Sequence, residues 1–361
     1  MNKRAFRLSL VYFIIPFCFL IGISWGLYVR QERIKPEINS KGKILRILVL
    51  KDFLPKTFLE NFSQQYNTKL EVTTTNNTVQ LMKTALSQRS SFDLILSHSM
   101  QASFLTSADF LSPIDFTEIP HIQDISRDFF GLPFDKDELF FAPILWGIMG
   151  FWGSAPSNTE TTIESVLESN GKKQFYSSTD PLYLYQIFTL SQKVSPVWVQ
   201  NNQSELLSSS FTKTINGWSF FSNWRDLLKL TKNHPNPSFS VYGPHTLKDE
   251  NLTSIDVGIK NQLVLWLWAI PKSAKNRNQA HLFIDFTIQN QAVLAQNTLL
   301  ACTSLICKEN KNIIPSQWAQ QMRKTNLYSF TIPEGHLANE PSWTKTLDDA
   351  QITKLTTSAS N

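Results

Sequence analysis

Apolar and polar residues alternate along residues 44–97 in a pattern that predicts strands and helices in turn. The expected strands are Ile44–Leu50, Lys69–Thr75 and Phe92–Ser97, and the expected helices are Lys56–Asn67 and Thr78–Gln88. Strands are favoured by runs of apolar and β-branched residues, and helices by apolar residues that recur on one helical face. This order predicts a mostly parallel sheet with right-handed crossovers, in which ligands lie at the carboxyl ends of the strands.

Two long apolar runs, Phe140–Gly153 and Gln262–Pro271, predict strands that lead out of this region and back into it. The other expected elements are a strand at Gln174–Ser177 and helices at Thr162–Ser169, Pro181–Gln192, Trp218–Thr231, Ala280–Leu300, Pro315–Arg323 and Trp343–Lys354. We therefore predict a two-lobed α/β fold with a ligand cleft between the lobes. Lobe 1 is expected at 44–145, lobe 2 at 146–265, and the return to lobe 1 with the C-terminal helices at 266–361.

The first 30 residues differ from the rest of the chain. A basic start is followed by 22 residues without a charge, Leu8–Val29, which is long enough to span a bilayer as an apolar helix. A cleaved signal peptide has the same layout, with small residues at the cut, and Ser24 and Gly26 have that spacing. Residues 1–30 are thus expected to be a membrane anchor or a signal peptide, with 31–43 as a linker. The basic start predicts that the remainder lies outside the cytoplasm.

Charge is concentrated near the N-terminus. Residues 1–46 carry nine Lys and Arg against two Glu, whereas the whole chain has a net charge of +5, so residues 47–361 carry −2. The basic balance therefore belongs to the segment next to the membrane, and a nucleic-acid partner is not expected.

Three cysteines occur, and two of them, Cys302 and Cys307, are five residues apart. They could form a disulfide in an oxidising compartment, or remain two half-buried thiols. No Cys/His group has the spacing of metal ligands, and the nucleophile, zinc-protease and phosphate-loop motifs are missing. We expect no metal, no cofactor and no catalytic residues, and hence no enzyme.

Four segments resemble the bacterial periplasmic spermidine/putrescine-binding proteins, which belong to the extracellular solute-binding proteins of ABC importers. The most specific is LPFDKDELFFAPILWGIMGFW, which is similar to the family's Pro-Phe-Asp and Pro-x-x-Trp-Gly crossing strand. The others are ILVLKDFLPKTFLENFSQQYNTKLEV, SFDLILS and LWAIPKSAKNRNQAHLFIDFTI. The resemblance covers roughly residues 44–355 and implies a periplasmic-binding-protein-like fold.

The same resemblance implies a ligand set. The family holds the methylenes of a polyamine between aromatic rings and its ammonium groups against carboxylates. The matching positions in this chain are Asp52, Phe53, His98, Asp180, Tyr183, Tyr242 and Trp266. Two acids are kept in type, Asp52 and Asp180, but the return-strand acid is replaced by Trp266. A family ring falls on Cys302.

Each of these residues also has an ordinary structural interpretation. Asp180 precedes a proline at an expected helix start and suits an N-cap. Asp52 could be a solvated loop acid, His98 an ordinary strand residue, and Trp266 a core residue.

The resemblance implies a periplasmic receptor, secreted or tethered to the inner membrane. It would be a monomer that delivers a small cationic or polar solute to an ABC permease. The alternative is a membrane-anchored module of the same fold that senses and does not transport.

Overall fold

The computed structural model describes residues 43–153, 175–178, 219–221, 239–243, 253–255, 262–298, 300–305 and 307. The apolar segment at 1–30 and nearly all of the linker therefore lie outside the described residues, as do the helices expected at 162–169, 181–192, 315–323 and 343–354. Of the helices that are described, none is long and apolar enough to cross a membrane.

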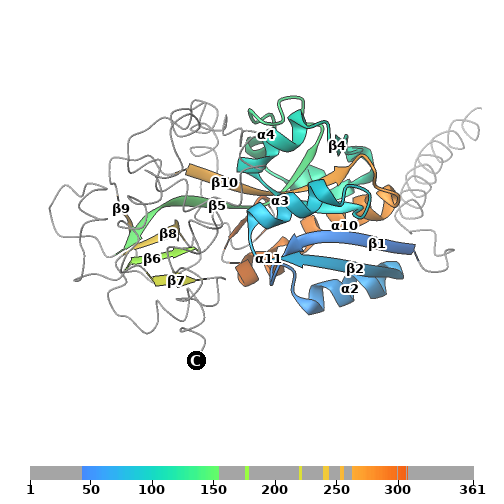
Figure 1. The fold of residues 1–361 in the computed structure, drawn as a ribbon. Helices are drawn as coiled ribbons and strands as arrows, with labels where there is room; N and C mark the ends of the chain where they lie inside the picture. Colours follow the sequence, from blue (N-terminus) through green and yellow to red (C-terminus); the bar gives the residue numbers. More distant parts are fainter. Residues whose placement is uncertain are drawn as a thin grey trace, which may run out of the picture.

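Three parallel strands form the first part of the sheet, as the sequence predicts, and a helix follows each of them (Figure 1). They are β1 (Lys43–Leu50), α2 (Lys56–Tyr66), β2 (Thr68–Thr75), α3 (Thr78–Ser87), β3 (Leu94–His98) and α4 (Ser99–Ser107). Strand β1 lies between β2 and β3 and pairs with both in parallel. Helix α4 was not expected from the sequence. Its first turn is capped by His98, whose ring accepts the Met100 N–H at 3.2 Å.

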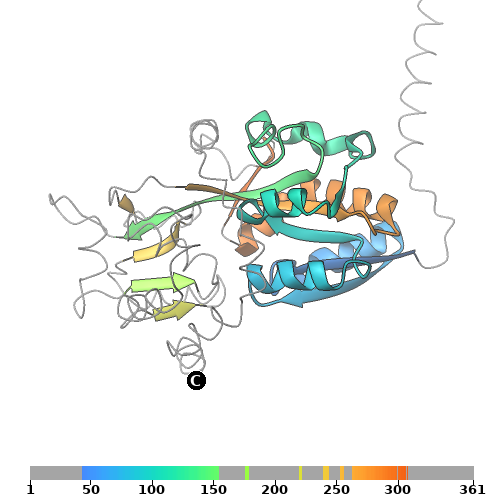
Figure 2. The same ribbon diagram turned by 45° about the horizontal axis from the view of Figure 1, so that its top comes forward.

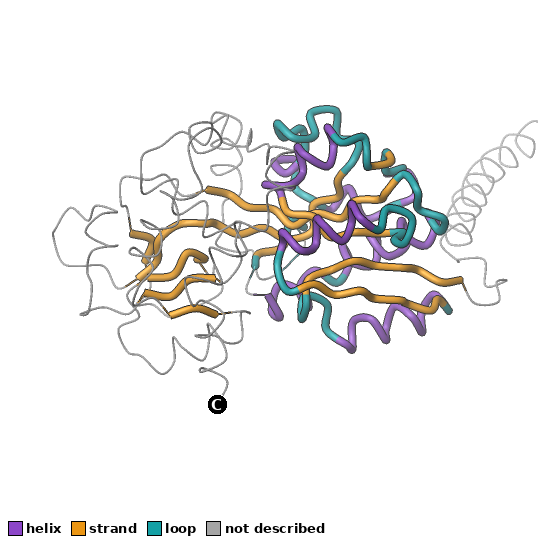
Figure 3. The backbone as a smooth tube through the Cα atoms, in the orientation of Figure 1, coloured by secondary structure: helices purple, strands orange, loops and turns teal. Residues whose placement is uncertain are grey.

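Two long antiparallel strands, β5 (Phe141–Gly153) and β10 (Gln262–Pro271), continue the sheet beyond β3. They run from the helix-covered part of the molecule to a second group of short strands (Figures 1 and 3). That group contains β6 (Phe175–Ser178), β7 (Ser219–Phe221), β8 (Phe239–Gly243) and β9 (Thr253–Ile255). This is the mixed α/β arrangement expected of a two-lobed protein. The lobe boundaries at 145 and 265 remain predictions.

Among the described residues, all strands belong to one eleven-stranded sheet of order β2-β1-β3-β10-β5-β8-β6-β7. Three further short strands lie off this path: β4 (Leu111–Ser112) pairs with β10, and β9 and β11 (Ala301–Cys302) pair with β5. Three short 3-10 helices lie between β4 and β5: η1 (Phe116–Glu118), η2 (Pro120–Asp124) and η3 (Arg127–Phe129).

Two sequence predictions are wrong in their details. The helix expected at Ala280–Leu300 is two helices, α10 (Arg277–Gln289) and α11 (Gln291–Thr298). They are separated at Asn290, whose side-chain amide donates to the Phe286 carbonyl at 2.8 Å and so competes with the helical backbone bonds. Within the helix expected at Trp218–Thr231, residues Ser219–Phe221 form β7, because their backbone pairs in parallel with β6.

Part of the core lies between the sheet and helices α2 and α10 (Figure 2), and helices α3 and α4 also contribute buried residues to it. Phe58 and Phe62 of α2 contact Phe286 and Phe283 of α10, with ring centroids 4.9 and 4.8 Å apart. Trp268 of β10 lies in edge contact with Phe283 at 5.7 Å. The helical spacing of these phenylalanines therefore places them all on buried faces.

Asp93 connects the amino end of β3 to β1 and to the turn before α10 through hydrogen bonds. Its side chain is buried, and its carboxylate accepts the backbone N–H groups of Arg46 (3.1 Å), Lys275 (2.8 Å) and Asn276 (3.0 Å). The Asn276 side-chain amide donates a fourth hydrogen bond at 3.1 Å. Asp93 thus joins β1, β3 and the turn before α10, and its role is structural.

Candidate functional site

The turn after β1 places one polar and one aromatic side chain at the carboxyl edge of the parallel strands. The Phe53 N–H donates to the Leu50 carbonyl at 3.2 Å, and Asp52 adopts a left-handed backbone conformation with φ 62°. As a result, Asp52 is exposed while Phe53 turns inward and is buried. Aspartate tolerates this conformation better than most residues.

Phe53, His98 and Trp266 form a contiguous group that we call the ring cluster. The ring centroids of Phe53 and Trp266 are 5.5 Å apart and tilted by 55°. Those of His98 and Trp266 are 4.8 Å apart and nearly perpendicular. The three rings come from the β1–α2 turn, the end of β3 and the middle of β10, so the fold brings together three of the seven predicted site residues.

His98 is fully buried, and its burial lowers the pKa of the imidazole to about 3. The imidazole is therefore neutral at physiological pH. Because its Nδ1 accepts the Met100 N–H, the ring proton lies on Nε2. His98 thus acts structurally as the N-cap of α4 and also contributes a neutral ring to the cluster.

Trp266 pairs in the antiparallel register with His98 on one side and with Leu145 of β5 on the other. The register of β10 with β5 shifts between Trp266 and Leu267, a β-bulge at the level of the ring cluster. Bulges often reorient side chains next to functional sites. The indole N–H of Trp266 is buried and has no hydrogen-bond partner.

The other predicted site residues are not joined to the cluster by the described contacts. Asp52 lies beside it but points to solvent, although its backbone carbonyl accepts the Asn297 side-chain amide at 2.7 Å. Tyr242 is in β8, where its backbone is paired with Met149 of β5. Asp180 and Tyr183 lie outside the described residues.

Two residues at this edge were missed from the sequence. Ser99 accepts the Leu265 N–H of β10 through its hydroxyl at 3.1 Å, next to Trp266. Asn297 of α11 holds the turn that carries Asp52 and Phe53. Ser99 could have been suspected from its place directly after a strand, whereas nothing in the local sequence distinguishes Asn297 from a surface amide.

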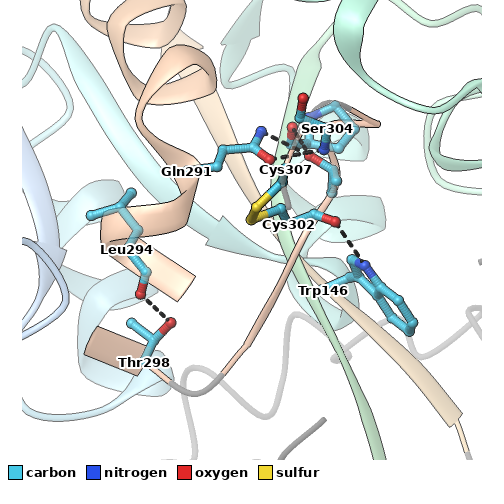
Figure 4. The surroundings of a disulfide bond; sticks show 9 residues. Trp146, Gln291, Leu294, Thr298, Cys302, Ser304 and Cys307 are labelled. Carbon is cyan, nitrogen blue, oxygen red and sulfur yellow. Dashed lines mark hydrogen bonds between the residues drawn. A yellow bond between two sulfur atoms is a disulfide. The ribbon is translucent and has the colours of Figure 1, made fainter. Parts of the chain in front are cut away.

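The two cysteines that the sequence left open are paired in the structure, Cys302 with Cys307, with their Cα atoms 6.2 Å apart (Figure 4). The Trp146 indole N–H donates to the Cys302 carbonyl at 2.9 Å, and β11 pairs with β5 at the same place. Gln291 of α11 binds the loop from the other side, through the Ser304 N–H at 2.9 Å and the Thr303 hydroxyl. The disulfide therefore closes a loop anchored on the long strand β5.

Other candidate sites are weaker. The described residues contain no group of three or more metal-ligating side chains. A shallow hollow of about 530 Å³ between α2 and α10 contains no predicted site residue and no charged side chain. Its lining is Asn61, Gln64, Gln65, Phe286, Gln289 and Asn290. These are mostly surface amides around one buried ring, as expected of a solvated helix face.

Comparison with protein-family models gives no match, and neither does comparison with the sequences of curated proteins. Solved structures, in contrast, match over most of the chain. A Listeria monocytogenes protein assigned to spermidine/putrescine ABC transport has 17% identity and a TM-score of 0.61, covering 86% of this chain and 99% of its own. The spermidine/putrescine substrate-binding protein PotD of Streptococcus pneumoniae has 15% identity and a TM-score of 0.54, covering 86% and 99%.

A third match is a periplasmic binding protein of Agrobacterium tumefaciens in complex with agropinic acid. It has 15% identity and a TM-score of 0.52, covering 87% of this chain and 98% of its own. At these identities the likeness concerns the fold, and it extends over nearly the whole length of each solved chain. The chain therefore has the periplasmic-binding-protein fold of ABC-transporter substrate-binding proteins, and its resemblance to the spermidine/putrescine receptors is confirmed at the level of that fold.

Proposed function

We propose that this protein is the extracytoplasmic solute-binding component of an ABC importer, and not an enzyme. The observation that carries the proposal is the ring cluster at the carboxyl edge of β1 and β3, beside the two long strands, in a fold shared with substrate-binding proteins. Ligands of open α/β sheets bind at this edge. The proposed partners are a small cationic or polar solute and an ABC permease of the inner membrane.

The proposed mechanism is closure about β5 and β10. A solute that contacts the ring cluster on one side and Asp180, Tyr183 and Tyr242 on the other would favour the closed form over the open one. The permease would then recognise the closed form. In this scheme, residues 1–30 either direct secretion or tether the receptor to the membrane, and the receptor works as a monomer.

A polyamine is the first solute to test, because two of the solved structures reported above are assigned to spermidine/putrescine transport. The alternative is a non-transporting, membrane-anchored receptor of the same fold. One observation favours it: Trp266 replaces the acid that the resemblance implies on the return strand, which removes an anchor for an ammonium group.

The test is thermal unfolding of the full-length protein in a mild detergent. The panel contains spermidine, putrescine, amino acids, thiamine and small anions. A solute at 100 times its Kd adds about 2.7 kcal/mol of stability, which raises Tm by a few degrees. A shift with any solute supports the importer receptor. No shift across the panel contradicts it and favours the non-transporting module.

A double variant, Asp52→Asn with Asp180→Asn, tests the cationic branch of the proposal. If the solute is a cation, removing both carboxylates weakens its binding, since a desolvated ammonium group needs a paired charge. Unchanged affinity in the double variant removes both residues from the site.

A further inference from the structure

The indole N–H of Trp266 is a buried donor that the folded chain leaves without an acceptor. The side chain is 3% exposed, and its Nε1 has no hydrogen-bond partner. Nearly all buried polar groups in native proteins are hydrogen-bonded, because an unmade bond costs the full desolvation of the group. A buried donor without an acceptor, beside a candidate ligand site, indicates a place where a ligand completes the bonding.

Trp268, two residues further along β10, is a useful comparison, because its place in the fold differs from that of Trp266. Its indole N–H is also buried without a partner. However, Trp268 pairs with Leu96 in the middle of β3 and lies against Phe283 in the core, so no solute can reach it. Trp266 instead pairs with His98, at the carboxyl end of β3 and the start of α4.

Two further features beside Trp266, the His98 ring and the start of α4, also favour an acceptor. His98 is neutral and carries its proton on Nε2, because Nδ1 already accepts the Met100 N–H. Helix α4 begins at the same point and has no acidic residue in its first turn, so its dipole favours a negative charge there. The carboxylate in the turn beside the cluster, Asp52, is exposed and follows the cation Lys51.

The spacing of the rings does not suit a polyamine chain. A methylene chain held between two ring faces needs about 7–8 Å between them, twice the optimal carbon–carbon separation. The centroids of Phe53 and Trp266 are 5.5 Å apart, and those of His98 and Trp266 are 4.8 Å apart. The rings therefore contact one another and leave no slot between them.

We propose that the ring cluster binds the carboxylate of an acidic solute, with the indole N–H of Trp266 as the specificity-determining donor. This assignment rests on the proposed function, since it names the solute class of the same site. The Trp266 indole N–H and the start of α4 complement an acceptor with negative charge. None of the three side chains of the ring cluster carries a carboxylate that could pair with an ammonium group.

The Phe53 ring packs against Trp266 in a tilted contact, and in this proposal the solute reaches the indole by displacing the Phe53 ring. Phe53 belongs to a short turn that is held by its own N–H bond to the Leu50 carbonyl and by the Asn297 side-chain bond to the Asp52 carbonyl. A ring–ring contact is weaker than a hydrogen bond from a buried donor to a charged acceptor, so the exchange favours binding.

The first experiment is isothermal titration calorimetry on the full-length protein in mild detergent. The probes are acetate, succinate, glutamate and 4-aminobutyrate, with spermidine and putrescine as the cationic arm. Binding of an acid without binding of either polyamine supports the proposal. Binding of a polyamine overturns it but leaves the importer receptor standing. Binding of none of these probes overturns it as well, and the broader thermal panel then decides whether the receptor function itself fails.

The second experiment separates recognition by Trp266 from general packing. For whichever acid binds, Trp266→Phe should weaken the affinity by about tenfold or more, the usual worth of a hydrogen bond to a charged group. Trp268→Phe is the matched control, because it removes the same unpartnered N–H from the core, and its affinity should stay within about threefold of the original.

A third variant controls for a loss of affinity that is caused by altered packing or folding. Trp266→His retains a ring N–H donor in a smaller side chain, so it should recover at least part of the affinity that Trp266→Phe loses. Equal losses in both Trp266 variants, or equal losses in Trp266→Phe and Trp268→Phe, would mean that only packing matters and would overturn the assignment.

Discussion

The buried polar groups at the two edges of the parallel strands differ in their hydrogen bonding. At the amino edge, Asp93 is buried, and its carboxylate is met by three backbone N–H groups and one side-chain amide. At the carboxyl edge, Trp266 is also buried, but its N–H has no hydrogen-bond partner, and the acid of the neighbouring turn, Asp52, points to solvent. Both edges are built from the same strands.

This difference in hydrogen bonding indicates a structural role for Asp93 and a binding role for Trp266. A buried carboxylate whose oxygens already accept hydrogen bonds holds elements together and has no free acceptor for a solute. A buried donor without an acceptor costs free energy in the unliganded protein, and that cost is recovered when an acceptor arrives. The amino edge is therefore expected to govern stability, and the carboxyl edge to govern binding.

The largest expected effect is at the amino edge. Asp93→Ala should lower the free energy of unfolding by about 3–5 kcal/mol, because it leaves three backbone N–H groups and one side-chain amide, all partly buried, without their acceptor. Urea unfolding followed by far-UV circular dichroism measures this. The matched control is Asp52→Ala, an exposed acid at the other edge, which should change stability by less than about 0.5 kcal/mol. Equal effects of the two variants would contradict the comparison.

Acid should destabilise the protein through the histidine of the carboxyl edge. The unfolded chain binds a proton on His98 near pH 6.5, whereas the folded protein resists until about pH 3, so the unfolded state binds more protons in this range. Stability should therefore fall with falling pH, by about 1.4 kcal/mol per pH unit from this residue.

His281 of α10 contributes in the same direction. Burial lowers its pKa, and the nearby Arg277 lowers it further, while Asp115 and Glu118 oppose the shift. Its Nε2 accepts the Asp115 N–H at 3.3 Å, a bond that protonation removes.

The variant His98→Asn isolates the share of His98 in this pH dependence. Asparagine is a favoured N-cap and keeps an acceptor for the first turn of α4, but it does not titrate. Thermal unfolding between pH 7 and pH 4 should show a slope reduced by about one proton. A slope that is unchanged in this variant would show that His98 is not kept neutral in the folded protein.

The disulfide should have an intermediate effect. Closing the short loop between Cys302 and Cys307 restricts the unfolded chain by about 2 kcal/mol on the loop-entropy model. Unfolding with and without a reductant measures this contribution. A variant with serine at both positions controls for other effects of the reductant, and it should be insensitive to it. A wild-type protein that responds no more than this variant would mean that the bond does not form in solution.

The smallest effect is expected at the turn that carries Phe53. Asn297→Ala removes the bond from the side-chain amide to the Asp52 carbonyl and should cost about 1 kcal/mol. Hydrogen exchange of the turn amides should become faster, while the exchange of β3 stays unchanged. Faster exchange throughout β3 would show that the turn is not an independent part of the carboxyl edge.

The sequence by itself determined the long strands and the parallel direction of the first three, but not the antiparallel pairing of β5 and β10. The apolar runs at Ile44–Leu50 and Phe92–Ser97 and the long runs at Phe140–Gly153 and Gln262–Pro271 predicted β1, β3, β5 and β10 to within two residues at each end. These predictions succeeded because the spacing of apolar residues along the chain differs between strands and helices. The resemblance to polyamine receptors added the fold, which the solved structures confirm.

The tertiary structure decided what the local pattern could not. Asn290 divides α10 from α11 through a side-chain bond, and Ser219–Phe221 is a strand because β6 lies beside it. The contact of Phe53 and His98 with Trp266 joins residues up to 213 positions apart in the sequence. Trp266 and Trp268 both have a buried N–H without a partner, but only Trp266 pairs with the last residue of β3. The pairing register is set by the folded chain, and this is why only the tertiary structure distinguishes Trp266 from a core tryptophan.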